Sequence, residues 1–221
     1  MAADVLVVMA RHPTPGAVKT RLASHLGAEG ACALYRAFLA DLATTCADGA
    51  WSVVWAVTPP QADLRPIVGA QARQLAQRGA DLAARMQYAF ADLFAAGAAR
   101  VVMLGADAPH LARARLADAF AALATHDAVV APTRDGGYCL IGLTAPHGLF
   151  TGIAMGTATV YAETMARAAE LGLRVALQET TFDVDEPQDL EALARLIDAG
   201  AVSLPATAAA LRSLARRERA G

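Results

Sequence analysis

The chain has 221 residues, and its 19 Lys and Arg against 21 Asp and Glu leave a formal net charge of −2. A chain of this length forms one domain, or one domain with a small appendage. A charge so close to zero excludes bulk electrostatic binding to nucleic acid or to an acidic membrane, so any basic ligand site must be local. The three cysteines have no metal or redox spacing, and their odd number argues against a disulfide framework.

Apolar runs in the sequence are too short to span a membrane. The first of them, residues 5–9, follows no basic segment, so we do not expect a signal peptide. Trp and Tyr are too few for an aromatic platform that binds nucleic acid. We therefore predict a cytoplasmic protein with no membrane or nucleic-acid partner.

Strand-like apolar runs alternate with helical patterns along the chain. This alternation predicts an α/β fold with three layers, in which helices cover both faces of a mostly parallel sheet. The predicted strands are residues 5–9, 51–57, 72–75, 100–104, 128–131, 137–143 and 174–177. A helix is expected to begin near Ala17, and the other predicted helices are residues 30–47, 81–96, 116–124, 157–170, 187–199 and 206–219.

The C-terminal segment is set apart by a predicted linker at residues 200–205. We expect residues 1–200 to form the main, ligand-binding domain and residues 201–221 to form a helical appendage. The last predicted helix is rich in alanine, so it could offer a packing surface for a second copy of the chain in a homodimer.

The loop that follows the first predicted strand carries the strongest functional signal. Residues 10–22 are A-R-H-P-T-P-G-A-V-K-T-R-L and include the cations Arg11, Lys19 and Arg21. A strand that ends in a Gly/Pro loop and leads into a helix places N–H groups and a helix dipole where an anion can bind. The spacing matches neither a Walker A motif nor G-x-G-x-x-G. The loop therefore predicts a phosphate-rich ligand.

Carboxylates follow two later predicted strands. Asp107 lies in the turn G-A-D-A-P, and Asp183 and Asp185 follow the last strand. Ligands of open α/β sheets bind beyond the carboxyl ends of the strands, and Mg²⁺ is usually held by one or two carboxylates plus substrate phosphates. Asp107 with Asp183 or Asp185 is therefore a candidate site for Mg²⁺ or Mn²⁺. Asp107 as a turn residue, and Asp185 as the cap of the helix at Pro187, are the alternatives.

Other residues near these loops are weaker candidates. The pair Gly136 and Gly137 could let the backbone approach a ligand closely, or could simply form a hairpin turn. Arg85 faces the crevice as a phosphate ligand, or is a solvated helix residue. His12 and His110 lie in the loops and could touch a ligand, although a loop histidine with no specific role is the more common case.

Taken together, these segments resemble a bacterial family of glycosyltransferase-A-like proteins, often described as similar to phospholactate guanylyltransferase. The wider superfamily is the nucleotide-diphospho-sugar transferases. The resemblance covers residues 5–196 and implies their fold. It rests on A-R-x-P-x-P-G-x-x-K-T-R-L at 10–22, L-Y-x-x-F-L-x-D at 34–41, Q-x-G-x-D-L-x-x-R-M at 77–86, G-x-D-x-P-x-L at 105–111, D-G-G-Y-x-L-I-G-L at 135–143 and D-V-D-x-P-x-D-L at 183–190.

The resemblance also implies roles for residues of the phosphate and metal sites. Asp107 corresponds to the metal-binding aspartate, and Asp183 or Asp185 to a second carboxylate. The motif around Asp107 is G-A-D and not the D-x-D of many glycosyltransferases, which favours nucleotidyl transfer. The loop positions that wrap a triphosphate correspond to Arg11, Gly16, Lys19 and Arg21.

Further positions of the resemblance concern the base and the acceptor. Gln77 and Asp81 lie where contacts to the nucleobase or ribose are often found. Gly136 and Gly137 correspond to a glycine turn on the substrate side. The segment G-I-A-M-G-T departs from the family, because Met155 stands where we expect Trp in relatives. That departure concerns the acceptor pocket and leaves the nucleotide site intact.

The leading prediction is a nucleotidyltransferase, dependent on Mg²⁺ or Mn²⁺, that transfers NMP from an NTP to a small phosphorylated acceptor. Such chemistry needs positioning and charge neutralisation more than a covalent nucleophile. Lys19 and Arg21 would offset charge on the leaving pyrophosphate, while Asp107 would hold the metal. A glycosyltransferase with a nucleotide-sugar donor and a regulatory nucleotide-binding protein without turnover are the alternatives.

Overall fold

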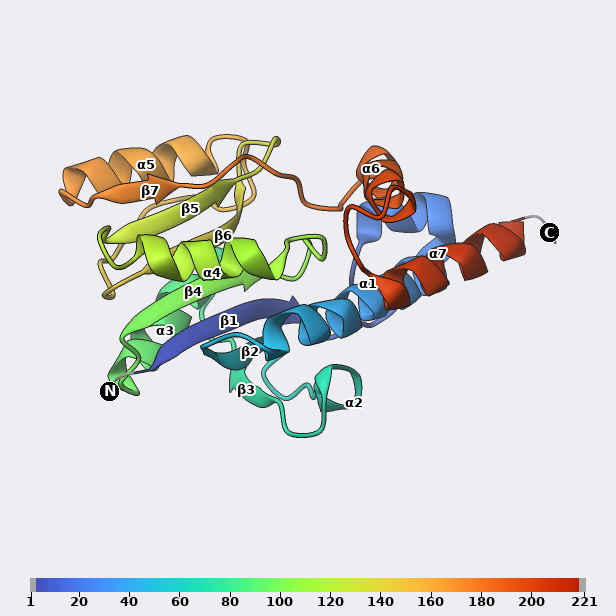
Figure 1. The fold of residues 1–221 in the computed structure, drawn as a ribbon, viewed down its shortest axis with the longest axis horizontal. Coiled ribbons are helices and arrows are strands. Elements are labelled where there is room, and N and C mark those ends of the chain that lie inside the picture. Colours follow the sequence, from blue (N-terminus) through green and yellow to red (C-terminus); the bar gives the residue numbers. More distant parts are fainter. Residues whose placement is uncertain (1–2, 219–221) are drawn as a thin grey trace.

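The computed structural model describes residues 3–218. They form a seven-stranded sheet with helices on both faces (Figure 1). The strand order is β3-β2-β1-β4-β6-β5-β7, and only β6 runs antiparallel to its neighbours. The predicted α/β fold with a mostly parallel sheet is confirmed. The strands are β1 (Asp4–Arg11), β2 (Ser52–Thr58), β3 (Arg73–Ala76), β4 (Arg100–Gly105), β5 (Ala128–Pro132), β6 (Tyr138–Leu143) and β7 (Val175–Leu177).

Both faces of the sheet are buried, which explains why the central strands are continuous apolar runs. On β1, Leu6 and Val8 pack with α1, α4 and α6, whereas Val5 and Val7 pack with α3 and α5. Among residues 3–218, no helix combines the length and the apolar character needed to cross a membrane. The helices are α1 (Thr20–Ala47), α2 (Arg65–Val68), α3 (Leu82–Ala95), α4 (Arg113–Ala122), α5 (Val160–Glu170), α6 (Pro187–Asp198) and α7 (Pro205–Glu218).

Each predicted strand overlaps an observed one, but several helix boundaries differ from the prediction. The first helix begins at Thr20 and not near Ala17, because Lys19 has the left-handed φ of 47°. It then continues past a non-helical residue, Gly27, into the segment predicted as helical. The short helix α2 was not predicted. The end of the last predicted helix, Arg219, lies outside the described residues.

The turn between β5 and β6 reverses the chain and inserts β6 between β5 and β4. Gly136 has a φ of 88°, and a Cβ there would lie 2.0 Å from the carbonyl oxygen of Ala158. Only glycine fits such a contact. Because β6 is antiparallel, its first residue, Tyr138, lies at the edge of the sheet where β1 and β4 end.

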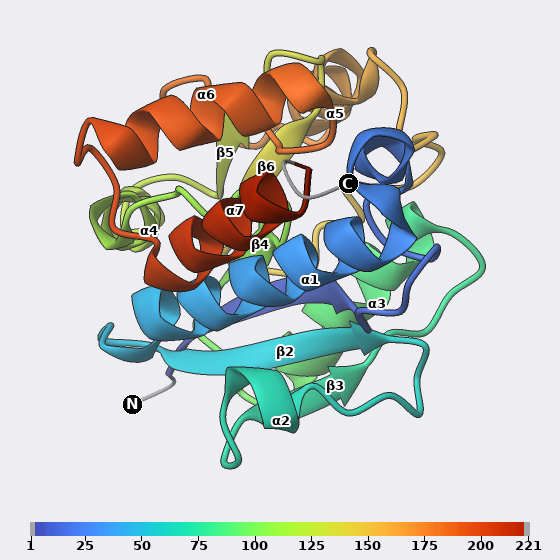
Figure 2. The same ribbon diagram turned by 90° about the vertical axis from the view of Figure 1, so that its right-hand side faces the viewer.

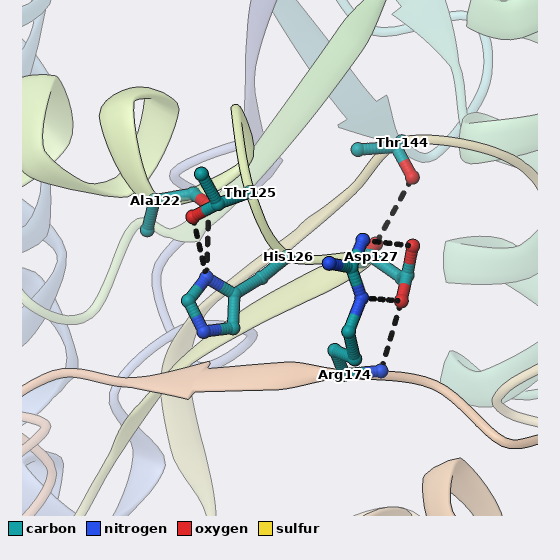
Figure 3. Close-up of polar contacts among 6 residues, drawn as sticks. All are labelled: Ala122, Thr125, His126, Asp127, Thr144 and Arg174. Carbon is teal, nitrogen blue, oxygen red and sulfur yellow. Dashed lines mark hydrogen bonds and ion pairs between the residues drawn. The ribbon is translucent and has the colours of Figure 1, made fainter.

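The opposite edge of the sheet is closed by polar contacts around Asp127 (Figure 3). Its carboxylate accepts from the backbone N–H of Arg174 at 2.9 Å and from the Nε of the same residue at 3.1 Å. These hydrogen bonds lower the pKa of Asp127. The Asp127 carbonyl accepts from the Thr144 hydroxyl at 3.3 Å. This cluster joins the starts of β5 and β7, so it serves the fold.

Helix α7 lies along α1 (Figure 2), and one buried carboxylate joins them. Asp41 of α1 is 3% exposed and accepts from the backbone N–H groups of Ala206 at 3.0 Å and Thr207 at 2.8 Å. These groups belong to the first turn of α7, which has no intrahelical acceptors for them. Asp41 is the last residue of the L-Y-x-x-F-L-x-D motif, so this part of the motif has a structural role.

The domain boundary at residue 200 and the homodimer stay predictions.

Replacing this carboxylate should weaken the attachment of α7. We expect Asp41→Ala to lower the free energy of unfolding by about 1–2 kcal/mol, because two buried N–H groups lose their acceptor. Urea unfolding followed by circular dichroism measures the change. Asp48→Ala, at the exposed end of the same helix, is the control and should change stability by less than about 0.5 kcal/mol. Equal stability of both variants would contradict this role of Asp41.

Candidate functional site

An open cleft of about 780 Å³ lies at the edge of the sheet where the parallel strands end. It is bounded by the loop between β1 and α1, the start of α3, the end of β4, the start of β6, the segment before α5 and the segment before α6. The predicted site residues that line it are Arg11, Lys19, Arg21, Gln77, Arg85, Asp107, Gly137, Asp183 and Asp185.

Three other predicted residues lie outside the lining of the cleft. Gly16 is exposed in the first loop, with a φ of 76°. Asp81 caps α3, where its carboxylate accepts from the backbone N–H of Ala84 at 2.8 Å. Gly136 packs against the segment before α5. Their predicted ligand contacts, like those of the lining residues, stay predictions.

Lys19 forms the centre of the site. Its side chain is only 2% exposed, and its Nζ contacts the Oδ1 of Asp107 and lies 3.0 Å from the Oδ1 of Asp185. Burial alone would lower the pKa of Lys19, but the two carboxylates raise it above its ordinary value, so the amine stays protonated. The Tyr35 and Phe38 rings lie 5.8 and 5.6 Å from Nζ. One cation therefore holds together the loops after β4 and before α6.

A backbone contact fixes the two acidic loops against each other. The Val184 N–H donates to the Asp107 carbonyl at 2.9 Å, which places Asp183 and Asp185 on either side of this anchor. The Oδ1 of Asp183 is buried and has no hydrogen-bond partner within the described structure. Burial, with Asp107 and Asp185 close by, raises the pKa of Asp183 to about 8.

Carboxylate oxygens are the ligands that hard divalent cations prefer. Asp107 and Asp185 lie close together, because both contact the Lys19 Nζ, and the buried Oδ1 of Asp183 lacks a hydrogen-bond partner. In residues 3–218, no group of three or more His, Cys, Asp or Glu side chains is arranged to hold a metal ion. An ion at Asp107 and Asp185 would therefore need further ligands, which the phosphates of a substrate can supply.

The Gln77 side chain is fixed in one orientation at the floor of the cleft. It is 6% exposed, and its Nε2 donates to the carbonyls of Ala10 at 3.1 Å and Ala56 at 2.7 Å. Since both amide hydrogens are engaged, Oε1 is the only group that Gln77 can offer to a ligand. A group that binds there must be a hydrogen-bond donor.

His110 has a structural role that the sequence did not indicate. Its Nε2 lies 2.9 Å from the Thr181 hydroxyl, and its ring stacks on Phe182 with centroids 4.2 Å apart. It thus joins the loop after β4 to the segment that carries Asp183. Burial, with Arg115 and Arg134 nearby, lowers the pKa of His110 to about 4, so the ring is neutral.

Tyr138 and Thr157 also line the cleft but were not among the predicted site residues, whereas Met155 was already linked to the acceptor pocket. The three residues line the cleft from β6 and from the segment before α5. The Tyr138 hydroxyl donates to the Met155 sulfur at 3.8 Å. Residues 144–159 form no regular helix or strand, so no periodic pattern could place them. The local signals of a turn-rich segment were Pro146 and the glycines Gly148, Gly152 and Gly156.

Acid should destabilise the fold through His110. Its pKa is lower in the folded chain than in the unfolded chain, so the unfolded chain takes up the proton first as the pH falls. The contribution of neutral His110 to the free energy of unfolding is therefore fully present above about pH 6.5 and is lost as the pH falls toward 4. We expect wild type to lose about 2 kcal/mol more than His110→Gln between pH 7.5 and pH 5.0 in urea unfolding.

The control for this measurement is His25→Gln, at an exposed position of α1. It should show the same pH dependence as wild type. If His110→Gln also followed the wild-type curve, the buried neutral state of His110 would be refuted.

Comparison with known proteins places the chain in a family. The family model described as "Uncharacterized protein conserved in bacteria (DUF2064)" matches residues 39–157. A crystal structure from Desulfovibrio desulfuricans G20, described as a "putative nucleotide-diphospho-sugar transferase", is 32% identical, covers 98% of each chain and has a TM-score of 0.89. No curated protein matches.

More distant solved structures share the fold alone. The 2-C-methyl-D-erythritol 4-phosphate cytidylyltransferase of Thermus thermophilus is 21% identical, with a TM-score of 0.52 over 88% of this chain and 100% of that one. A CMP:2-keto-3-deoxy-manno-octonic acid synthetase in complex with CTP is 12% identical, with a TM-score of 0.57 over 90% of this chain and 100% of that one. The sequence predicts a transferase, and this prediction is confirmed. The chain belongs to the DUF2064 family, within the nucleotide-diphospho-sugar transferase superfamily.

Proposed function

We propose that this protein is a metal-dependent nucleotidyltransferase that transfers NMP from an NTP to a small acceptor. The observation that carries the proposal is the buried Lys19, held between Asp107 and Asp185 in a cleft that also collects Arg11 and Arg21. Nucleotidyl transfer requires cations and metal-binding carboxylates around one chain of phosphates. The superfamily membership and the cytidylyltransferase structures with the same fold support this choice.

The phosphates would bind between the first loop and the start of α1. The Arg11 guanidinium is positioned by a hydrogen bond from Nη1 to the Ala17 carbonyl at 3.1 Å. The Arg21 side chain is 69% exposed and can move toward a ligand. The first turn of α1 has no side-chain cap, so its N–H groups are free to bind an anion. Lys19 and Arg21 would neutralise the charge that develops on the leaving pyrophosphate.

Asp107 and Asp185 would hold one divalent cation, and substrate phosphates would complete its ligands. Asp183 is the alternative second carboxylate. The ion would supply Lewis-acid stabilisation of the phosphates when bound. Lys19 already holds the two carboxylates close together, so their positions are set before a ligand arrives. His110 acts on the site indirectly, because it fixes the segment that carries Asp183.

The nucleobase would lie over Gln77. Because Oε1 is its one free group, a base with an N–H donor at this point is preferred. Arg85 lies at the rim, where its Nε donates to the Gly79 carbonyl at 3.3 Å. It could bind the phosphates from the side opposite the first loop.

Glycosyl transfer from a nucleotide-sugar is the second candidate. The cluster of Lys19, Arg11 and Arg21 suits a nucleoside diphosphate as well as a triphosphate, and the adjacent part of the cleft, at Tyr138 and Met155, is uncharged. Product analysis separates the two reactions. Nucleotidyl transfer releases pyrophosphate from an NTP, whereas glycosyl transfer releases a nucleoside diphosphate from a nucleotide-sugar.

A ligand panel tests the proposed function. NTPs and nucleotide-sugars are added with and without Mg²⁺, and the thermal unfolding temperature is measured, because a ligand that binds the folded state raises it. We expect one NTP with Mg²⁺ to give the largest rise and to yield pyrophosphate with an acceptor. Tight binding without any metal-dependent product would favour the regulatory alternative.

Variants test the roles of the central residues. With the NTP found in the panel, Lys19→Met and Asp107→Asn should each reduce turnover by about 10²-fold or more. Lys19→Met removes a cation that would neutralise the reacting phosphates, and Asp107→Asn removes a charged ligand of the proposed metal ion. Arg195→Met, an exposed ion-pair residue of α6, is the control and should keep wild-type turnover. Near-normal turnover in folded Asp107→Asn would contradict the assignment of Asp107.

A further inference from the structure

The cleft has two halves of different charge. The first half holds the lining cations Arg11, Lys19, Arg21 and Arg85. The second, which we name the acceptor half, has no Lys, Arg or His among its described lining residues. The acceptor half is lined by Asp135, Gly137, Tyr138, Cys139, Ile141, Met155, Gly156, Thr157, Ala158 and Val160.

The nearest cations outside the acceptor half are engaged elsewhere. The Arg134 guanidinium lies 5.4 Å from the centre of the Phe182 ring and does not line the cleft. Arg115 donates to the Glu179 carbonyl at 2.5 Å and to the Gln178 amide oxygen at 3.3 Å. An anionic group in the acceptor half would therefore find no positive partner on these elements.

A carboxylate is built into this half instead. The Oδ1 of Asp135 accepts from the Thr133 hydroxyl at 2.6 Å and from the Gly137 N–H at 3.1 Å. Its Oδ2 makes no such contact and is left for a ligand. A carboxylate oxygen accepts hydrogen bonds but cannot donate them. It therefore suits a hydroxyl group. Because Asp135 is exposed, it would repel each negative charge of a phosphate by about 1 kcal/mol at about 4 Å.

The remaining lining of the acceptor half is mainly apolar. Tyr138 and Met155 contact each other, and both pack against the core on the α3 and α5 face of the sheet. The first turn of α5 is anchored to the turn at Gly136, whose carbonyl accepts from the Tyr161 N–H at 2.9 Å. Such a surface fits the C–H groups of a sugar or polyol better than a charged group.

We propose that the acceptor half binds an uncharged, hydroxyl-bearing group, such as a sugar or polyol without phosphate. This inference rests on the proposed function, and it replaces the phosphorylated acceptor that the sequence predicts. In the transfer, the acceptor hydroxyl oxygen forms a bond to the α-phosphorus, and the bond from that phosphorus to the bridging oxygen breaks. Pyrophosphate leaves with the electron pair, and the hydroxyl proton is released to solvent.

The test uses matched pairs of probes: glucose with glucose 1-phosphate, mannose with mannose 1-phosphate, and glycerol with glycerol 3-phosphate. Each is titrated calorimetrically with Mg²⁺, both without nucleotide and with the α,β-methylene analogue of the NTP that the panel identifies. We expect the uncharged member of at least one pair to bind at least 10-fold more tightly than its phosphorylated partner. Tighter binding of the phosphorylated members, or binding of no member, would overturn the inference.

A charge variant shows whether Asp135 causes the preference. Asp135→Asn keeps the Oδ1 acceptor of the turn and removes only the charge, so it should reduce the preference about 5-fold or more. Asp198→Asn, an exposed aspartate at the end of α6, is the control and should keep the wild-type preference. An unchanged preference in Asp135→Asn would remove this residue from the explanation.

The same experiments separate this inference from the proposed function. If a nucleotide binds with Mg²⁺ but the phosphorylated probes bind more tightly, only the acceptor class is wrong. A nucleotide-sugar that binds more tightly than its nucleoside diphosphate would assign the uncharged sugar to the donor, which keeps the chemistry of the acceptor half and favours glycosyl transfer. Titrations without nucleotide measure the preference for uncharged over phosphorylated probes even if the proposed function is wrong.

Discussion

The geometry of the site depends on one buried cation shared by two carboxylates. A buried lysine is costly unless it is paired, and the removal of either partner leaves an uncompensated charge. Lys19 precedes α1, Asp107 follows β4 and Asp185 precedes α6, so this cluster joins three loops at one edge of the sheet. The left-handed backbone of Lys19 is a strained conformation that these contacts hold in place. Under the proposed function, phosphate ligands and structural carboxylates would use the same cation.

The direction of β6 gives the cleft its second half. If β6 ran parallel to its neighbours, the turn before it would lie at the opposite edge, where Asp127 and Arg174 close the sheet. The tight hairpin at Gly136 instead places Asp135 and Tyr138 beside the ends of β1 and β4. A single antiparallel strand thus brings the loop after β1 and the acceptor half together in one continuous cleft.

Local patterns predicted the fold better than the site. The buried strands were predictable, because burial on both faces produces continuous apolar runs such as the one in β1. The strand ends also indicated which loops would meet. The start of α1 was predicted wrongly, because Lys19 is held by residues far away in the sequence. The contacts of His110 and the fixed amide of Gln77 likewise depend on partners that no local pattern indicates.

The nucleophilic groups of the cleft bear on the type of reaction. In the described part of the chain, Cys139 is the only thiol that lines the cleft, and its burial raises its pKa to about 12. Burial also raises the pKa of the Tyr138 phenol to about 12. Both groups are therefore protonated near neutral pH and are weak nucleophiles. Neither group is therefore suited to form a covalent enzyme intermediate. Under the proposed function, a direct displacement between two bound substrates would require both halves of the cleft to be filled at once.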